Sequence, residues 1–235
     1  MANFKEIHDL LLKKIPVEDS YSQEKYGAFN CDNLQEVKKI LYCVTPSDRI
    51  DKYFKDNDYD LLIAHHIGSS SHPYMIFHTA LDFCKGGLTD YWSTLLKIKD
   101  PQYIQKNAGL YGKIDPIPFD ELVEKIDKEI DGIEGQIYSK NEIIESVAVC
   151  SGLGAIIQKS VEALDVDCYI LGQTWSDVEN TKLNGMIETG HTKSERIGVH
   201  TIRNILKDYN LQIDVAPLDI DVYGSEVHVK KFSWY

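Results

Sequence analysis

Two adjacent histidines, His65 and His66, close the apolar run Leu61–Ala64. The run lies between Asp60 and a polar, glycine-containing stretch at 68–73, a pattern typical of a parallel strand covered on both faces. In α/β proteins, side chains at the carboxyl ends of such strands line the ligand site. Neighbouring strand residues face opposite ways. We therefore expect both imidazoles to serve one site only if the strand ends there and the backbone twists.

Two later segments make the histidine pair look like part of a metal site. One runs from His78 to Asp82, and the other from His191 to Glu195. Histidine nitrogen and carboxylate oxygen together suit zinc, manganese, iron, cobalt or nickel. Five such ligands can hold two ions and leave positions open for water. The wide spacing predicts a site that is assembled by folding.

In this order, the segments resemble the dinuclear metal-binding family called Nif-three-like, often described as type-two GTP cyclohydrolase-like. The resemblance runs from about residue 1 to about residue 220. The segments that carry it are Asp60–His66, His78–Asp82 with Gly86 and Gly87, Val149–Gly154, and Gly190–Glu195.

The resemblance implies five metal ligands: His65, His66, Asp82, His191 and Glu195. It also implies a pair of divalent ions and metal-dependent hydrolysis of a nucleotide or another phosphate-bearing small molecule by a metal-activated water. Relatives assemble as toroidal hexamers, so we expect a homo-oligomer. The alternative is a metal-binding or interaction protein without turnover.

The chain departs from the family pattern at three places. Ile67 stands where the family usually has proline, and Ala80 where it has asparagine. The family also carries a Gly-Asp segment with a histidine a few residues on, and the chain reads Gly172-Gln173 and then Asp177 there. Asp177 is therefore our candidate for the proton-transfer role of the missing histidine.

Composition limits the partners and the compartment. The 235 residues suffice for one large or two small domains, and the net charge of -12 argues against broad binding to nucleic acid or anionic membrane. We find no signal peptide and no apolar stretch long enough to span a bilayer. The five cysteines are scattered and contain no Cys-x-x-Cys pair, which favours a reducing, cytoplasmic location. We predict that Cys43, Cys150 and Cys168 are buried structural thiols.

Helical and strand-like patterns alternate and predict an α/β protein with mainly parallel sheets. We expect one compact unit of two α/β subdomains, 1–105 and 106–235, with the metal site in the cleft between them. The predicted helices are 4–15, 47–54, 73–84, 119–130, a segment ending at 164, one beginning at 176 and one beginning at 193. The predicted strands are 37–44, 60–66, 146–150, 167–171, a short one ending at 190, and 211–217. The tail from 219 to 235 has no assignment.

Three site segments have structural alternatives. Thr192–Glu195 is also a capping-box sequence, in which Glu195 would only satisfy a backbone donor at a helix start. The turn Gly152–Gly154 offers backbone donors for a phosphate, or else gives tight strand-to-helix packing. Asp82 could be a surface carboxylate, but the end of a helix disfavours negative charge, so a nearby cation explains it better.

Overall fold

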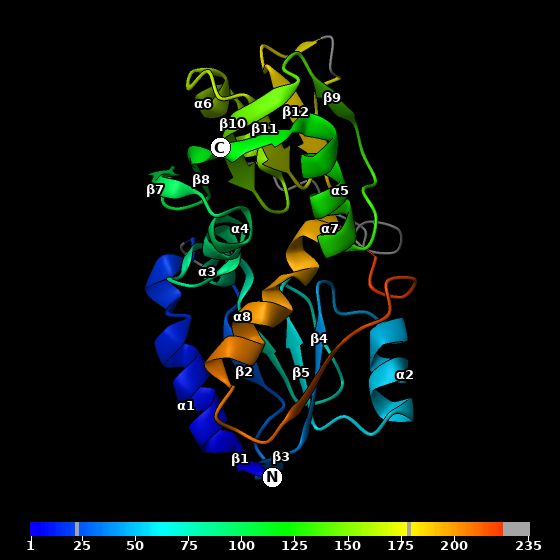
Figure 1. Cartoon of the computed structure of the whole chain (residues 1–235). Coiled ribbons are helices and arrows are strands. Elements are labelled where there is room, and N and C mark those ends of the chain that lie inside the picture. The colour runs from blue at the N-terminus through cyan, green and yellow to red at the C-terminus, as the bar shows by residue number, and fades with distance from the viewer. Residues whose placement is uncertain (22–23, 178–179, 223–235) are drawn as a thin grey trace.

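Within residues 1–21, 24–177 and 180–222, which the computed structural model describes, the strands form two large sheets (Figure 1). We call them the β4 sheet and the β10 sheet. The β4 sheet has the order β13 (Gln212–Val215), β4 (Lys39–Cys43), β5 (Leu61–Ala64), β6 (Tyr74–Ile76) and β2 (Gly27–Phe29). The β10 sheet has the order β7 (Lys99–Ile104), β8 (Gly109–Pro118), β10 (Ile143–Cys150), β11 (Cys168–Leu171), β12 (Gly185–Glu188) and β9 (Ile137–Ser139). A small ribbon pairs β1 (Ala2–Asn3) with β3 (Glu36–Val37).

Most strands in each large sheet run in the same direction. In the β4 sheet only the edge strand β2 is antiparallel to the strand beside it, β6. In the β10 sheet β10, β11 and β12 are parallel, and β8 and β9 are antiparallel to the strands beside them. The prediction of an α/β protein with mainly parallel sheets is therefore confirmed, with antiparallel strands added towards the edges.

Helices cover both faces of the β4 sheet because its central strands are apolar on both faces. The helices α1 (Phe4–Lys14) and α8 (Gly198–Ile205) lie on the side of Tyr42 and Ile63. The helix α2 (Asp48–Asp56), whose first turn is capped by Ser47, lies on the side of Leu41 and Leu62. Figure 1 shows α1 and α8 on one side of this sheet and α2 on the other.

The β10 sheet is covered in the same way. The amphipathic helix α5 (Phe119–Ile130) packs Leu122 and Ile126 against one face. The short helix α6 (Gln158–Glu162), preceded by the 3-10 turn η2 (Gly154–Ile156), packs against the other face. A second 3-10 turn, η1 (Val17–Asp19), follows α1.

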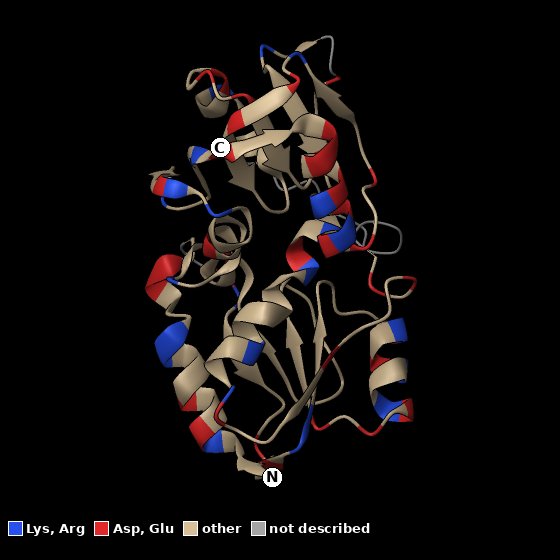
Figure 2. Ribbon diagram, viewed as in Figure 1, with Lys and Arg blue, Asp and Glu red and all other residues tan. Residues whose placement is uncertain are grey.

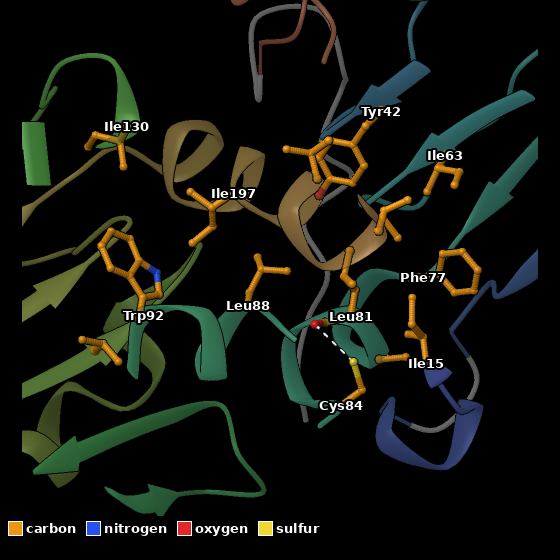
Figure 3. Packing of buried hydrophobic residues seen from close by; sticks show 14 of the residues in the cluster. Ile15, Tyr42, Ile63, Phe77, Leu81, Cys84, Leu88, Trp92, Ile130 and Ile197 are labelled. Atoms are coloured by element: carbon orange, nitrogen blue, oxygen red, sulfur yellow. Dashed lines mark hydrogen bonds between the residues drawn. The ribbon is translucent and has the colours of Figure 1, made fainter. Parts of the chain in front are cut away.

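One continuous core runs through both sheets. The helix α4 (Leu88–Leu96) contributes Leu88 and Trp92 to it, and Ile197 lies at the junction of α8 with α7 (His191–Arg196). Figure 3 shows these side chains between Tyr42 of the β4 sheet and Ile130 of α5. Ile63, Leu81 and Ile197, which lie close in sequence to the predicted ligands, belong to the same core.

Two strands cross the predicted boundary between the halves. Strand β7, from the 1–105 half, belongs to the β10 sheet, and strand β13, from the 106–235 half, pairs with β4. The sheets thus do not divide at a single point of the chain. The boundary between the predicted subdomains stays a prediction.

The predicted helix 73–84 is wrong in its first part. Residues Tyr74–Ile76 form β6 between β5 and β2, and only His78–Phe83 form the helix α3. A short apolar run that is buried in a sheet cannot be told from a buried helical turn by periodicity alone. The helix predicted at 119–130 is confirmed with the same bounds.

Charged residues lie on the outer helices. Acidic and basic residues intermix along α1, α2 and α5 (Figure 2), and the charged residues of α5 are exposed or partly exposed. No helix among the described residues has the length and apolar character needed to cross a membrane. The cysteines are all free, and burial raises the pKa of the Cys150 thiol to about 12. The prediction of buried structural thiols at Cys43, Cys150 and Cys168 is confirmed.

Candidate metal centre

The histidine pair lies just beyond the end of β5. The amide of His65 donates to the carbonyl of Cys43 at 3.0 Å, and that of His66 to the carbonyl of Val44 at 2.7 Å. Both imidazoles are buried, and their ring centroids are 5.2 Å apart. Because the regular strand ends at Ala64, the two neighbouring side chains reach the same site.

Helix α3 brings a third histidine and a carboxylate to this pair. The ring of His78, the first residue of α3, lies 5.4 Å from that of His65 and 5.6 Å from that of His66. One turn later, Asp82 Oδ1 lies 3.7 Å from His65 Nε2. His65, His66 and His78 each offer a ligand atom, and these atoms lie within 4.8 Å of one another. His78 was not among the predicted ligands.

Helix α7 closes the cluster from the other side. Glu195 Oε1 lies 3.1 Å from His191 Nε2 and 3.4 Å from His65 Nε2, and Glu195 Oε2 lies 2.9 Å from His66 Nε2. The nitrogens of His66 and His191 are themselves 3.3 Å apart. The structure therefore brings together all five residues that the resemblance implied as ligands.

The capping-box alternative for Glu195 is wrong. The N-cap of α7 is Gly190, whose φ is +99°, and no side chain caps this helix start. Thr192 already lies inside the helix. The Glu195 residue, 4% exposed, turns its carboxylate towards the histidines rather than towards a backbone donor.

Several buried atoms of the cluster make no hydrogen bond within the described residues. They are both ring nitrogens of His65, Nδ1 of His78, Oδ1 of Asp82 and Oε2 of Glu195. Glu195 Oε2 is close to a histidine nitrogen, but the contact lacks hydrogen-bond geometry. Buried polar groups normally have partners, so unpaired nitrogen and carboxylate oxygen atoms gathered in one buried cluster fit a cation bound among them.

The electrostatics of the cluster centre on Glu195. Burial raises the pKa of this carboxyl, but the charges of His191, His66 and His65 outweigh burial and hold it well below its usual range. Burial lowers the pKa of His65, but Glu195 and Asp82 outweigh burial and raise it to about 9. For His66 burial prevails, and its pKa falls to about 4. Burial raises the pKa of Asp82 to about 6.

Three histidines of the cluster have a polar neighbour at Nδ1. The hydroxyl oxygen of Thr45 lies 2.8 Å from Nδ1 of His66. Gln173 Oε1 lies 3.1 Å from Nδ1 of His191. A carboxylate oxygen of Glu24 lies 3.1 Å from Nδ1 of His78, as an ion-pair contact without hydrogen-bond geometry. Outer partners of this kind fix the tautomer and ring orientation of metal-binding histidines.

The glycine turn after β10 packs against the cluster. Gly152 has φ +59°, and a Cβ there would lie 2.2 Å from Glu195 Oε1. A Cβ on Gly154 would lie 2.6 Å from Cβ of Leu171. The amides of Gly152, Gly154 and Ala155 already donate to Ser194, Gly152 and Gln173. These bonds support the packing alternative over a phosphate cradle.

Asp177 is not part of the cluster that the described residues form. It is exposed, and Trp175, two residues earlier, is 73% exposed. The contacts of the described residues join Gln173 to the cluster, through His191, rather than Asp177. A role of Asp177 in proton transfer stays a prediction.

A pocket of about 430 Å³ opens beside the cluster. Its volume is in the range of small-molecule sites. The described lining contains no lysine or arginine and consists of Glu134, Gly135, Gly172, Gln173, Glu188, Gly190, His191, Thr192, Leu218, Asp221 and Val222. His191 is the residue that the pocket shares with the cluster.

The two sheets and the histidine–carboxylate cluster define an α/β protein with a candidate metal centre. Residues 73–223 match the sequence model of the DUF34/NIF3 family (NGG1p interacting factor 3), and the chain belongs to this family. This match confirms the resemblance inferred from the motifs.

Individual relatives agree with the family match. The chain is 27% identical over 159 residues to a "GTP cyclohydrolase 1 type 2 homolog" of Streptococcus pneumoniae, an alignment that spans only 60% of either protein. Its fold is similar to that of reduced HcgD from Methanocaldococcus jannaschii, with a TM-score of 0.72, 22% identity and coverage of 91% and 97% of the two chains. It is also similar to TTHA1606 from Thermus thermophilus, with a TM-score of 0.75, 15% identity and coverage of 96% and 100%. At these identities the structural likeness shows the fold alone.

Proposed function

We propose that the chain binds two divalent metal ions and hydrolyses a nucleotide or another phosphate-bearing small molecule. The proposed ligands are His65, His66, Asp82, His191 and Glu195. The observation that carries the proposal is the position of Glu195, a buried carboxylate within 3.4 Å of ring nitrogens from three histidines. Zinc, manganese, iron, cobalt and nickel all suit this donor set.

The residues of the chain have separate roles in such a metal site. Glu195 Oε1 faces His65 and His191, and Glu195 Oε2 faces His66. Asp82 lies beside His65. Gly152 leaves room for the Glu195 carboxylate. When bound, a pair of ions supplies a water of lowered pKa and polarises the electrophile.

The pocket beside His191 supports a small-molecule substrate. Its volume of about 430 Å³ admits one, and His191 places the ligand cluster at its wall. Because the described lining carries glutamates and no lysine or arginine, the positive charge for a substrate phosphate has to come from bound metal. The relative named GTP cyclohydrolase 1 type 2 homolog agrees with a nucleotide as the first substrate class to test.

A second candidate function is metal binding without turnover. The exposure of Asp177 favours it, because a general acid or base has to reach the reacting atoms and no described contact joins Asp177 to the cluster. In that case, the metal-bound protein would act in regulation or in binding a partner.

We also propose that the chain forms a homo-oligomer, up to a hexamer, and light scattering would measure its size. The proposed location is cytoplasmic. The free cysteines support a reducing compartment. Fractionation of the native host would test the location.

One experiment separates the two candidate functions. Protein purified without chelator is analysed for metal, then screened against nucleotides and phosphate esters with and without a chelator. Metal-dependent turnover that the chelator abolishes supports the hydrolase. Bound metal without turnover supports the second candidate, and failure to bind any of the five metals contradicts both.

A further inference from the structure

A buried aspartate from the C-terminal part of the chain anchors the end of β4. Asp221, 0% exposed, follows β13 and a turn at Pro217. Its carboxylate accepts hydrogen bonds from the amide of Val44 at 2.9 Å and from the amide of Thr45 at 2.9 Å. These amides lie just beyond the last residue of β4, so Asp221 fixes the backbone where the strand ends.

That backbone carries the outer partner of a proposed ligand. The Thr45 hydroxyl oxygen lies 2.8 Å from His66 Nδ1, and Thr45 is 5% exposed. A hydroxyl that accepts from Nδ1–H leaves Nε2 to face the cluster. Because Asp221 holds the Thr45 amide, it also determines where the hydroxyl meets the ring.

The same carboxylate reaches the helix that carries Glu195. Arg196 follows Glu195 in α7, and its Nη1 lies 3.4 Å from Asp221 Oδ2 and 2.6 Å from the carbonyl of Ala216. Asp221 is thus linked to one ligand through Thr45 and to another through Arg196. One link starts from the residues just after β4, and the other lies in α7.

We propose that Asp221 is a positioning residue for the metal centre, acting on His66 through Thr45 and on Glu195 through Arg196. The inference rests on the metal-binding function proposed above. A positioning residue differs from a purely structural anchor in one respect. A structural anchor affects the stability of the metal-free fold, whereas a positioning residue also sets the affinity of the folded protein for metal.

The test measures Zn²⁺ affinity of the full chain by competition with a chromophoric chelator. Thr45→Val removes the hydroxyl at nearly constant volume, and Thr45→Ser restores it. Asp221→Asn weakens the hydrogen bonds that hold the amides of Val44 and Thr45. Thr89→Val is the matched control, because Thr89 is also buried and its hydroxyl bonds the carbonyl of Asn107 instead. Melting in excess chelator verifies that each variant is folded.

We expect Thr45→Val and Asp221→Asn each to weaken Zn²⁺ binding by about 10- to 100-fold, the usual cost of losing an outer partner. Thr45→Ser and Thr89→Val should bind like the parent. The double variant should lose less than the product of the single losses, because both changes act along one path. If the parent binds Zn²⁺ and both variants bind it equally well, the inference is overturned while the proposed function stands. If the parent binds no Zn²⁺ or other test metal, both fail.

Hydrogen exchange on the parent protein tests the same coupling without a variant. If Asp221 couples β4 to the metal, then by reciprocity Zn²⁺ should strengthen the bonds that the amides of Val44 and Thr45 make to it. Their exchange should slow on Zn²⁺ loading by more than that of amides in β11, which is in the other sheet. Equal slowing, or none, would contradict the positioning role.

Discussion

Replacement of Glu195 by glutamine is the substitution that should affect the metal centre most selectively. The side chains have the same size, but a neutral amide is a poorer ligand for a divalent cation than a carboxylate. Glu195 lies within 3.4 Å of nitrogens from His65, His66 and His191, so its negative charge acts on three other proposed ligands at once. Because Gly190 is the N-cap of α7, the substitution leaves the helix start unchanged.

The magnitude follows from ligand linkage. Loss of an outer partner alone weakens metal sites by about 10- to 100-fold, so we take about 100-fold as the least effect of losing a ligand. At a free Zn²⁺ concentration about 100 times the parent Kd, metal stabilises the parent by about 2.7 kcal/mol and the variant by only about 0.4 kcal/mol. For a chain of 235 residues, about 1 kcal/mol shifts Tm by about 2–4 °C. Zn²⁺ should therefore raise Tm by about 5–10 °C in the parent and by about 1 °C in Glu195→Gln.

The assay is thermal unfolding with Zn²⁺ and with excess chelator, and the quantity compared is the shift that Zn²⁺ causes in each protein. Glu188→Gln is the control, because Glu188 is a partly buried carboxylate that bonds the amides of Gln136 and Thr174 outside the cluster. The control should keep the full Zn²⁺ shift even if its metal-free Tm falls. A Glu195→Gln protein with the parent's shift would refute the assignment of Glu195 as a ligand.

Three further predictions address the same centre. Because the pKa of His65 is raised to about 9 and its proton must leave before metal binds, apparent Zn²⁺ affinity should rise about tenfold per pH unit from pH 7 towards pH 9. Below pH 6, where Asp82 also takes up a proton, competitive titration should give a steeper slope, and a flat profile would contradict both assignments. Gly152→Ala places a methyl 2.2 Å from Glu195 Oε1 at a positive φ, so calorimetry should show lost Zn²⁺ binding and a loss of stability of at least about 1 kcal/mol. Asp177→Asn should reduce turnover by about 10²- to 10⁴-fold at unchanged metal content if Asp177 moves protons, and unchanged turnover would remove it from the mechanism.

The sequence could predict the elements whose signal is local. The run before His65 predicts a buried strand because all four of its residues are apolar, and the structure has β5 there, buried on both faces. Helix α5 has the predicted bounds because its apolar residues recur at helical spacing and its charges fall on the opposite face. The order of the three ligand segments along the chain, which resembles that of the family, then predicted a single metal site.

Strands whose partners in the sheet are far away in the sequence could not be predicted in this way. Tyr74–Ile76 forms a strand because β5 and β2 lie on either side of it, which the apolar run itself does not reveal. The β7–β8 hairpin was missed because its exposed strand β7 lacks a clear apolar alternation. Strand β13 joins β4 from the far end of the chain, and no local pattern indicates that partner.

The outer partners of the histidines were missed for a similar reason. Thr45, Gln173 and Glu24 lie on separate loops and share no motif with the histidines they contact. Single threonines, glutamines and glutamates are too common for spacing to mark them. His78 is different, because it lies four residues before Asp82, a spacing that puts both side chains on one helix face and could have indicated it.

The number of metal ions per folded chain tests the central claim most directly. Protein is purified without chelator, reconstituted in turn with zinc, manganese, iron, cobalt and nickel, freed of excess metal and measured by elemental analysis against protein concentration. Five ligands with two carboxylates among them predict a value near two for at least one metal, and a lower value for Glu195→Gln. A value near zero for every metal, in protein that melts cooperatively, would contradict the account.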